Sequence, residues 1–242
     1  MPDALDDDAA HLWLLPAPAP PDADEAARCL ALLDDTERAR LATLSLPAVR
    51  WEYLRARALV RSVLSRYNTV DARAWRFGVN AWGRPFALGD AGLHFNLSHT
   101  RGMLCVVVAR HEAVGVDVEW IARPGETVAV AHRYFAPAEL AALAALPEAL
   151  QRDAFFDFWT LKEAYIKARG RGLGIPLRQF AFTRGEPIAV AFDAALGDDP
   201  ARWDFVRFDP CSAHRVALAL GRVGGRPLRW RVRVADDLWG LR

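Results

Sequence analysis

The chain has 242 residues, enough for one large domain or two small ones with a buried core. Its hydrophobic share of 52% and charged share of 25% are ordinary for a globular protein, and a net charge of +1 gives no argument for nucleic acid or an anionic membrane. Three isolated cysteines exclude a CxxC pair and argue against a disulfide framework or a cysteine zinc site, so we expect a reducing, cytoplasmic setting.

The predicted elements of the first half follow an acidic N-terminus that lacks the pattern of a signal peptide. Residues 16–21 are rich in proline and should be extended. Residues 22–44 are rich in alanine, leucine and glutamate and predict helix, and residues 48–67 have the apolar spacing of an amphipathic helix. Strands are expected at 75–79, 93–97 and 103–109.

The second half opens with a predicted strand at residues 114–119. Residues 128–167 predict helix interrupted at Pro137 and Pro147, and glycines at 170–174 end this region. The remaining strands are expected at 180–183, 188–192, 203–208, 215–220 and 228–234. We therefore expect an α+β fold of two halves, residues 1–114 and 115–242, each with helices and a mainly antiparallel sheet.

A run of arginines lies in and after the predicted helix 48–67, with Glu52 and Asp71 as the only acids among them. A clustered basic surface attracts phosphates or an acidic partner, although a solvated helix face has the same pattern. The arginines are Arg50, Arg55, Arg57, Arg61, Arg66, Arg73 and Arg76.

Two carboxylates, Asp117 and Glu119, share one face of the predicted strand 114–119, because side chains alternate along a strand. Adjacent carboxylates repel unless a cation lies between them. Mg²⁺, which prefers oxygen ligands and binds phosphates, fits this need. A solvated face of an amphipathic strand is the alternative.

A second group of charges lies near the end of the predicted helix. Glu163 and Lys167 are four residues apart and share a face, and Lys162 and Lys167 bracket the glutamate. Such cations around one carboxylate suit a phosphate and a metal held together. A surface glutamate–lysine pair is the alternative.

Two loops add hydrogen-bond donors. The segment Asn96-Leu97-Ser98-His99-Thr100 follows a strand, as phosphate-binding loops do, or forms a polar turn. Arg84 stands between Gly83 and Pro85, which would hold its guanidinium in place for a bidentate phosphate contact. The sequence has no P-loop, HExxH or GxSxG motif, and the glycines at 170–174 follow a helix, which excludes a Rossmann loop.

The order and spacing of these pieces resemble the surfactin-type 4′-phosphopantetheinyl transferases over about residues 50 to 182. The matching pieces are Gly83-Arg84-Pro85, the segments 95–100, 115–119 and 158–167, and the Gly-Arg-Gly-Leu that follows. The resemblance implies two similar α+β halves that form an intramolecular pseudo-dimer, with coenzyme A in the cleft between them, and a monomeric protein.

The resemblance implies that the chain transfers 4′-phosphopantetheine from coenzyme A to a serine of an apo acyl or peptidyl carrier protein and releases 3′,5′-ADP. It assigns Mg²⁺, together with the pyrophosphate, to Asp117, Glu119 and Glu163. It assigns coenzyme A contacts to Arg84, Ser98, His99, Lys162 and Lys167. The family often has an arginine where this chain has Glu52, and Arg50 or Arg55 is a candidate to replace it.

In the expected reaction Glu163, directly or through a water, accepts the proton of the carrier serine, and Lys167 stabilises charge on the phosphoryl oxygens. The acidic helix of the carrier would meet the stretch from Arg55 to Arg76 or the surface of the second half. Other functions stay open from the residues alone: an Mg²⁺-dependent coenzyme A or nucleotide pyrophosphohydrolase, a non-catalytic coenzyme A binding module, or a structural protein. The sequence does not name the carrier or its pathway.

Overall fold

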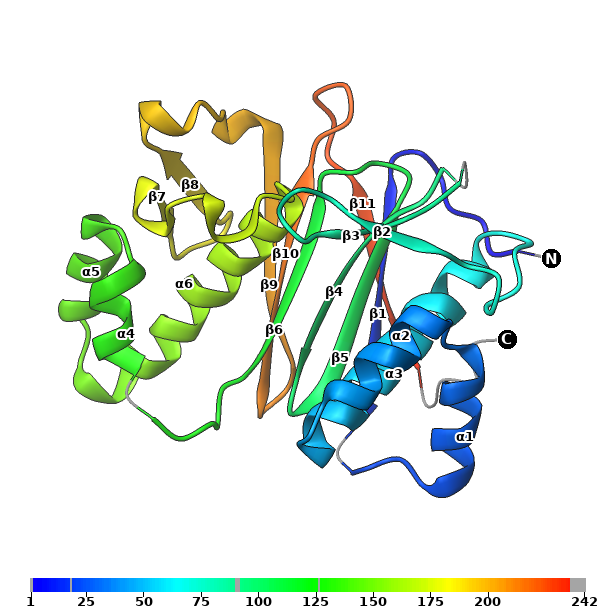
Figure 1. Cartoon of the computed structure of the whole chain (residues 1–242). Coiled ribbons are helices and arrows are strands. Elements are labelled where there is room, and N and C mark those ends of the chain that lie inside the picture. Colours follow the sequence, from blue (N-terminus) through cyan, green and yellow to red (C-terminus); the bar gives the residue numbers. More distant parts are fainter. Residues whose placement is uncertain (1, 18, 90–91, 126, 236–242) are drawn as a thin grey trace. The chain divides into compact units, whose positions relative to one another are not determined.

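The computed structural model describes residues 2–17, 19–89, 92–125 and 127–235 (Figure 1). The chain forms two compact units with a mixed α+β fold. Among the described residues, the first unit takes those up to Val79, those within Pro85–Glu112 and those from Arg229 to Ala235, and the second takes Asn80–Arg84 and those within Ala113–Leu228. The division expected from the sequence had placed Asn80–Arg84 in the first half and the last strand in the second.

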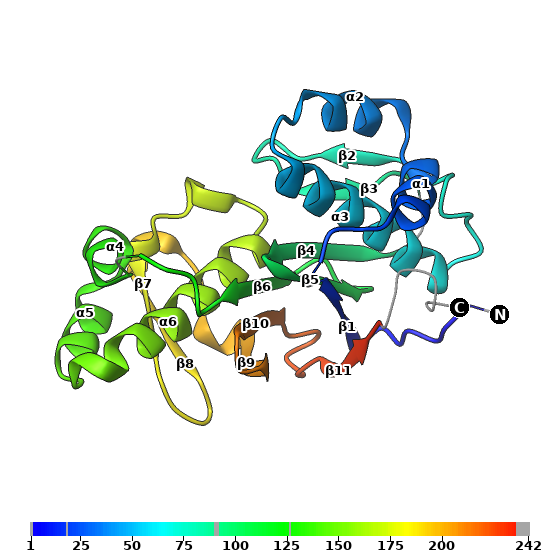
Figure 2. The ribbon, with the colours of Figure 1, turned by 90° about the horizontal axis from the view of Figure 1, so that it is seen from below.

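The first unit is built on a four-stranded sheet with the order β11-β1-β5-β4. Strand β5 pairs antiparallel with β1 and β4, whereas β11 pairs parallel with β1. Figure 2 shows the three helices and the β2–β3 hairpin on one side of this sheet. The strands are β1 (Ala9–Ala17), β2 (Phe77–Val79), β3 (Pro85–Ala87), β4 (His94–Thr100), β5 (Gly102–Ala109) and β11 (Arg229–Val234). The helices are α1 (Ala23–Leu32), α2 (Asp35–Thr43) and α3 (Pro47–Arg66).

Helix α3 forms the core of this unit with the sheet, as its apolar period predicts. Its buried residues Leu59 and Val63 belong to one apolar cluster with Val106 and Val108 of β5. The helical structure predicted for residues 22–44 is confirmed, but it is divided between α1 and α2. Asp34 starts a new helix there, because its side chain accepts the N–H of Glu37 while Glu37 accepts the N–H of Asp34.

Two strands of the first unit were not predicted from the sequence. Strand β1 lies inside the sheet, and its first seven residues are all buried, so it lacks the alternation that marks a strand with one solvated face. Strand β3 has only three residues and forms a hairpin with β2.

The second unit is built on the antiparallel sheet β6-β10-β9. Helix α6 packs along β6 and β10 (Figure 1). The strands are β6 (Val114–Trp120), β7 (Phe180–Thr183), β8 (Ala189–Phe192), β9 (Trp203–Cys211) and β10 (His214–Gly221). The helices are α4 (Thr127–Tyr134), α5 (Pro137–Ala144) and α6 (Glu148–Ala168), with short 3₁₀ turns at Gly172–Gly174, Leu177–Gln179, Ala194–Leu196 and Pro200–Arg202.

The predicted helix breaks of the second unit are confirmed. Pro137 is the first residue of α5, where a helix tolerates proline, and Pro147 immediately precedes α6. In the described ranges no helix has the length and apolar character needed to cross a membrane. The three cysteines are free in this structure.

Gly115 allows β6 to lie very close to α6. A Cβ atom at this position would lie 2.2 Å from the carbonyl oxygen of Ala164 and 2.5 Å from the backbone nitrogen of Ala168. Both atoms belong to the backbone of a long helix, so neither can turn aside as a flexible side chain could. The glycine therefore sets the spacing between the strand and the helix.

Gly115→Ala is expected to lower the free energy of unfolding by about 1–3 kcal/mol, the usual range for overpacking a tight core contact. Urea unfolding followed by circular dichroism measures the change. Gly185→Ala is the matched control, because its added Cβ would come no closer than 4.0 Å to the nearest atom, the carbonyl oxygen of Pro187. Equal stability of the two variants would contradict the close approach of β6 to α6.

Candidate active site

The site begins with an ion pair between the two elements that Gly115 brings together. Lys167 on α6 donates from Nζ to Oδ1 of Asp117 on β6, at 2.6 Å. Asp117 is 4% exposed, and its neighbours Val116 and Val118 are buried as well. Both faces of β6 are therefore covered at this point, and the Asp117 carboxylate faces helix α6 and not solvent.

Glu119 lies two residues further along β6 and is held from two sides. The indole N–H of Trp159 on α6 donates to its Oε1 at 2.8 Å, and Arg123 lies 3.0 Å from its Oε2. Neither Trp159 nor Arg123 was predicted as a site residue. The aromatic content of the segment around Glu163 was the only sign of Trp159.

Glu163 completes the carboxylate cluster of Asp117, Glu119 and Glu163. It is half-buried on α6, one turn before Lys167, and its carboxylate accepts no hydrogen bond from the residues that the structure describes. Burial raises the pKa of Glu163 to about 7, with a further contribution from the charge of Asp117. Burial and Asp117 likewise raise the pKa of Glu119 to about 7, against the lowering effect of Arg123. A bound cation would therefore reduce the electrostatic repulsion among the three carboxylates.

The chemistry of these donors fits Mg²⁺, but the side chains do not form a finished cage. Over the described part of the chain, no three histidine, cysteine, aspartate or glutamate side chains lie close enough to hold a metal by themselves. Mg²⁺ is commonly held by one or two carboxylates together with substrate phosphates and waters. The cluster therefore fits an ion that is shared with a phosphate ligand.

Arg84 lies in the second unit, at the tip of the β2–β3 hairpin. Its guanidinium donates to the carbonyl oxygens of Ala168, at 2.9 Å, and of Val114, at 3.3 Å. These residues are the last of α6 and the first of β6, so Arg84 joins the ends of the two elements that carry the carboxylates. Its predicted contact with coenzyme A stays a prediction.

Lys162 lies apart from the cluster, on another face of α6. Successive helical residues point about 100° apart, so the residue before Glu163 faces a different side. Its fully buried ammonium lies 2.8 Å from Oε2 of Glu139 and donates to the carbonyl oxygens of Leu177 and Phe180. With these acceptors and no exposed surface, the ammonium has no donor left for a ligand. We therefore correct the sequence-based assignment and leave Lys162 out of coenzyme A binding.

Ser98 and His99 belong to β4 of the first unit. Ser98 is 5% exposed, and His99 is exposed beside it. His99 Nδ1 lies 3.7 Å from Oε2 of Glu52 on α3. The histidine predicted to bind phosphate thus stands next to a carboxylate.

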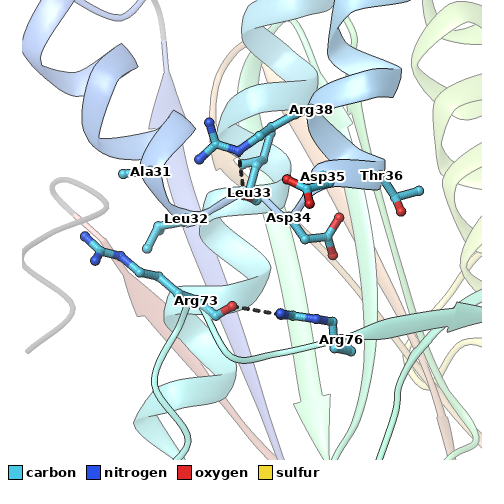
Figure 3. Close-up of a pocket in the computed structure, with 9 residues that line it drawn as sticks. All are labelled: Ala31, Leu32, Leu33, Asp34, Asp35, Thr36, Arg38, Arg73 and Arg76. Atoms are coloured by element: carbon cyan, nitrogen blue, oxygen red, sulfur yellow. Dashed lines mark hydrogen bonds between the residues drawn. The ribbon is translucent and has the colours of Figure 1, made fainter.

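The arginine run does not form the basic surface that its sequence suggests. Arg55 pairs with Glu25, Arg66 with Asp3, and the buried Arg61 with Asp34 and Glu37. Arg73 and Arg76 remain exposed. They border a pocket of about 540 Å³ where α1 ends and α2 begins (Figure 3), together with Ala31, Leu32, Leu33, Asp34, Asp35, Thr36 and Arg38. None of the predicted site residues lines this pocket.

Comparison with known proteins gives one consistent family. The sequence profile of the 4′-phosphopantetheinyl transferase superfamily matches residues 113–220, which include β6 and α6. The chain is 31% identical to the 4′-phosphopantetheinyl transferase HetI of Nostoc sp., over 92% of each chain. It is also 31% identical to the 4′-phosphopantetheinyl transferase Sfp of Bacillus subtilis, over 64% of this chain and 71% of that one.

A solved structure also resembles the chain. The holo-[acyl-carrier-protein] synthase of Thermotoga maritima matches 44% of this chain and 60% of its own, with a TM-score of 0.36 and 22% sequence identity.

Proposed function

This chain belongs to the 4′-phosphopantetheinyl transferase superfamily, and we propose that the carboxylate cluster on β6 and α6 is the centre of its reaction. The reaction transfers 4′-phosphopantetheine from coenzyme A to a serine of an apo carrier protein and releases 3′,5′-ADP. The observation that carries the proposed site is the Lys167–Asp117 pair, which joins two carboxylate-bearing elements beside two glutamates with raised pKa values.

Asp117, Glu119 and Glu163 would hold Mg²⁺ together with the pyrophosphate of coenzyme A. The bound ion would neutralise charge on the pyrophosphate as its P–O bond breaks. Trp159 and Arg123 keep the Glu119 carboxylate in position, since each bonds or pairs with one of its oxygens. Lys167 would exchange part of its contact with Asp117 for the phosphoryl oxygens, where it stabilises developing negative charge.

Glu163 would accept the proton of the attacking serine hydroxyl. A general base works best when its pKa lies near the working pH, and burial already raises the pKa of this carboxyl to about 7. The serine oxygen then bonds to the β-phosphorus, and 3′,5′-ADP leaves. Arg84, Ser98 and His99 would contact the 3′-phosphate region of coenzyme A.

Intact-mass spectrometry tests the function. A purified apo carrier protein, incubated with this chain, coenzyme A and Mg²⁺, should gain one phosphopantetheine, and EDTA should abolish the gain. Release of 3′,5′-ADP without modification of any acyl or peptidyl carrier would favour a pyrophosphohydrolase. Coenzyme A binding without either product would favour a non-catalytic binding module.

The partners that we propose are a carrier protein and coenzyme A, with the chain acting as a cytoplasmic monomer. Because Arg55, Arg61 and Arg66 are paired internally, the exposed members of the arginine run that could meet an acidic carrier are Arg73 and Arg76. The surface of the second unit is the other predicted docking site. Carrier binding should weaken as salt increases, since exposed charges are screened.

Binding of Mg²⁺ should depend strongly on pH. Glu119 and Glu163 have pKa values of about 7, raised from 4.5. Between pH 4.5 and about pH 7 the folded ligand-free protein therefore holds more protons than the unfolded chain. Its free energy of unfolding falls as the pH rises through this range. Mg²⁺ binds the ionised carboxylates. Its stabilising effect should therefore be small near about pH 6 and several-fold larger near about pH 8.

Thermal unfolding in the presence of coenzyme A, with and without Mg²⁺, at the two pH values measures this effect, because the carboxylates would hold the ion together with the pyrophosphate. The double variant Glu119→Gln/Glu163→Gln should lose the metal-dependent shift, whereas Glu148→Gln, on the exposed first turn of α6, should retain it. An equal shift at both pH values would contradict the assignment of the ion to this cluster.

A further inference from the structure

A carboxylate stands where the proposed phosphate contact of the first unit is expected. Glu52 Oε2 on α3 lies 3.7 Å from His99 Nδ1 on β4, and the two side chains are 36% and 42% exposed. The Glu52 carboxylate and the His99 imidazole are therefore exposed side by side. A ligand phosphate that meets His99 therefore also meets Glu52.

The pair offers no net positive charge to such a phosphate. If His99 is protonated, its charge is balanced by Glu52. If His99 is neutral, the pair carries a charge of −1. A phosphate at this point gains less from electrostatic attraction than it would gain beside a histidine alone or beside an arginine.

The two arginines that the sequence offered as replacements are engaged elsewhere. Arg50 donates to the carbonyl oxygens of Leu41 and Leu44. Arg55 donates to both carboxylate oxygens of Glu25 and to the carbonyl oxygen of Ala19. Glu52 and Arg55 also line one pocket of about 430 Å³ together with Arg101, so a carboxylate and two arginines, one of them paired with Glu25, face the same space.

We propose that Glu52 is a specificity-determining residue that weakens recognition of the 3′-phosphate, so that 3′-dephospho-coenzyme A serves almost as well as coenzyme A. The inference rests on the proposed function, in which Ser98 and His99 meet that phosphate. The chemistry is otherwise unchanged. The serine oxygen bonds to the β-phosphorus, the pyrophosphate P–O bond breaks, the serine proton passes to Glu163, and 5′-AMP leaves in place of 3′,5′-ADP.

The experiment compares kcat/KM for the two donors, with one carrier protein at a fixed saturating concentration. The parent chain should prefer coenzyme A over the dephospho donor by no more than about threefold in kcat/KM. Glu52→Arg should raise this preference about 10-fold to 100-fold, because a charge-assisted hydrogen bond strengthens binding by about that factor. The gain should come from a lower KM for coenzyme A. Glu52→Gln should give a smaller change in the same direction. Asp24→Asn, an exposed charge change on α1, should leave the preference unchanged.

Calorimetric binding of the two donors provides a second readout that needs no turnover. A parent preference above about tenfold, or a preference that Glu52→Arg and Glu52→Gln leave unchanged in binding and kinetics, would overturn the role of Glu52. Failure of both donors to modify any carrier would instead refute the proposed function, and the binding ratio would still decide the role of Glu52.

Discussion

Glu163→Gln is expected to lower turnover by about 10²–10⁴-fold, the usual contribution of a positioned general base. The amide cannot accept the serine proton, and it is a poorer ligand for Mg²⁺ than a carboxylate. Initial rates of carrier modification at saturating coenzyme A and Mg²⁺ measure the loss. Glu148→Gln, at the exposed start of the same helix, should retain nearly full activity.

The stability of Glu163→Gln separates a catalytic role from a structural one. Burial raises the pKa of Glu163, which means that its ionised form is costly in the ligand-free fold. At about pH 8 the neutral glutamine should therefore leave the free energy of unfolding equal to or above that of the parent. A variant that is inactive because it unfolds would contradict this assignment, as would a variant that keeps its turnover.

Lys162→Met is expected to lower the free energy of unfolding by about 3–5 kcal/mol, because it leaves a buried carboxylate without its cation. Glu139 and Lys162 are both fully buried, and Glu139 also accepts the backbone N–H groups of Ala136 and Phe182. The pair thus joins α5, α6 and β7 inside the second unit. Urea unfolding measures the loss.

The double variant Glu139→Gln/Lys162→Met is the control for this pair. Glutamine removes the orphaned charge and keeps a carbonyl oxygen as acceptor, so the double variant should be more stable than Lys162→Met alone. If Lys162→Met kept the stability of the parent and bound coenzyme A more weakly, Lys162 would be a coenzyme A contact. A loss of stability with coenzyme A affinity retained in the folded fraction would support its structural role.

Much of the local structure could be predicted from the sequence, because it follows from periodicity and from residues that break it. The apolar spacing of residues 48–67 predicts α3, and Pro137 and Pro147 mark the starts of α5 and α6. Alternation along 114–119 places Asp117 and Glu119 together, and helical spacing places Glu163 and Lys167 together. The motif order also identifies the family.

The tertiary structure alone decided which surfaces these side chains face. Periodicity places Lys162 on a different face of the helix from Glu163, but the partner on that face, Glu139, comes from α5. The arginine run is basic in sequence, yet Glu25, Glu37 and Asp3 neutralise much of it from other elements.

The same limit explains why the pairing of distant strands could not be predicted from the sequence. Strand β11 joins the first unit through parallel pairing with β1, although it comes last in the chain. The role of Gly115 also depends on the backbone of α6, more than forty residues away. Local sequence determines the elements and their faces, whereas contacts between distant segments, which carry no local pattern, determine what each face meets.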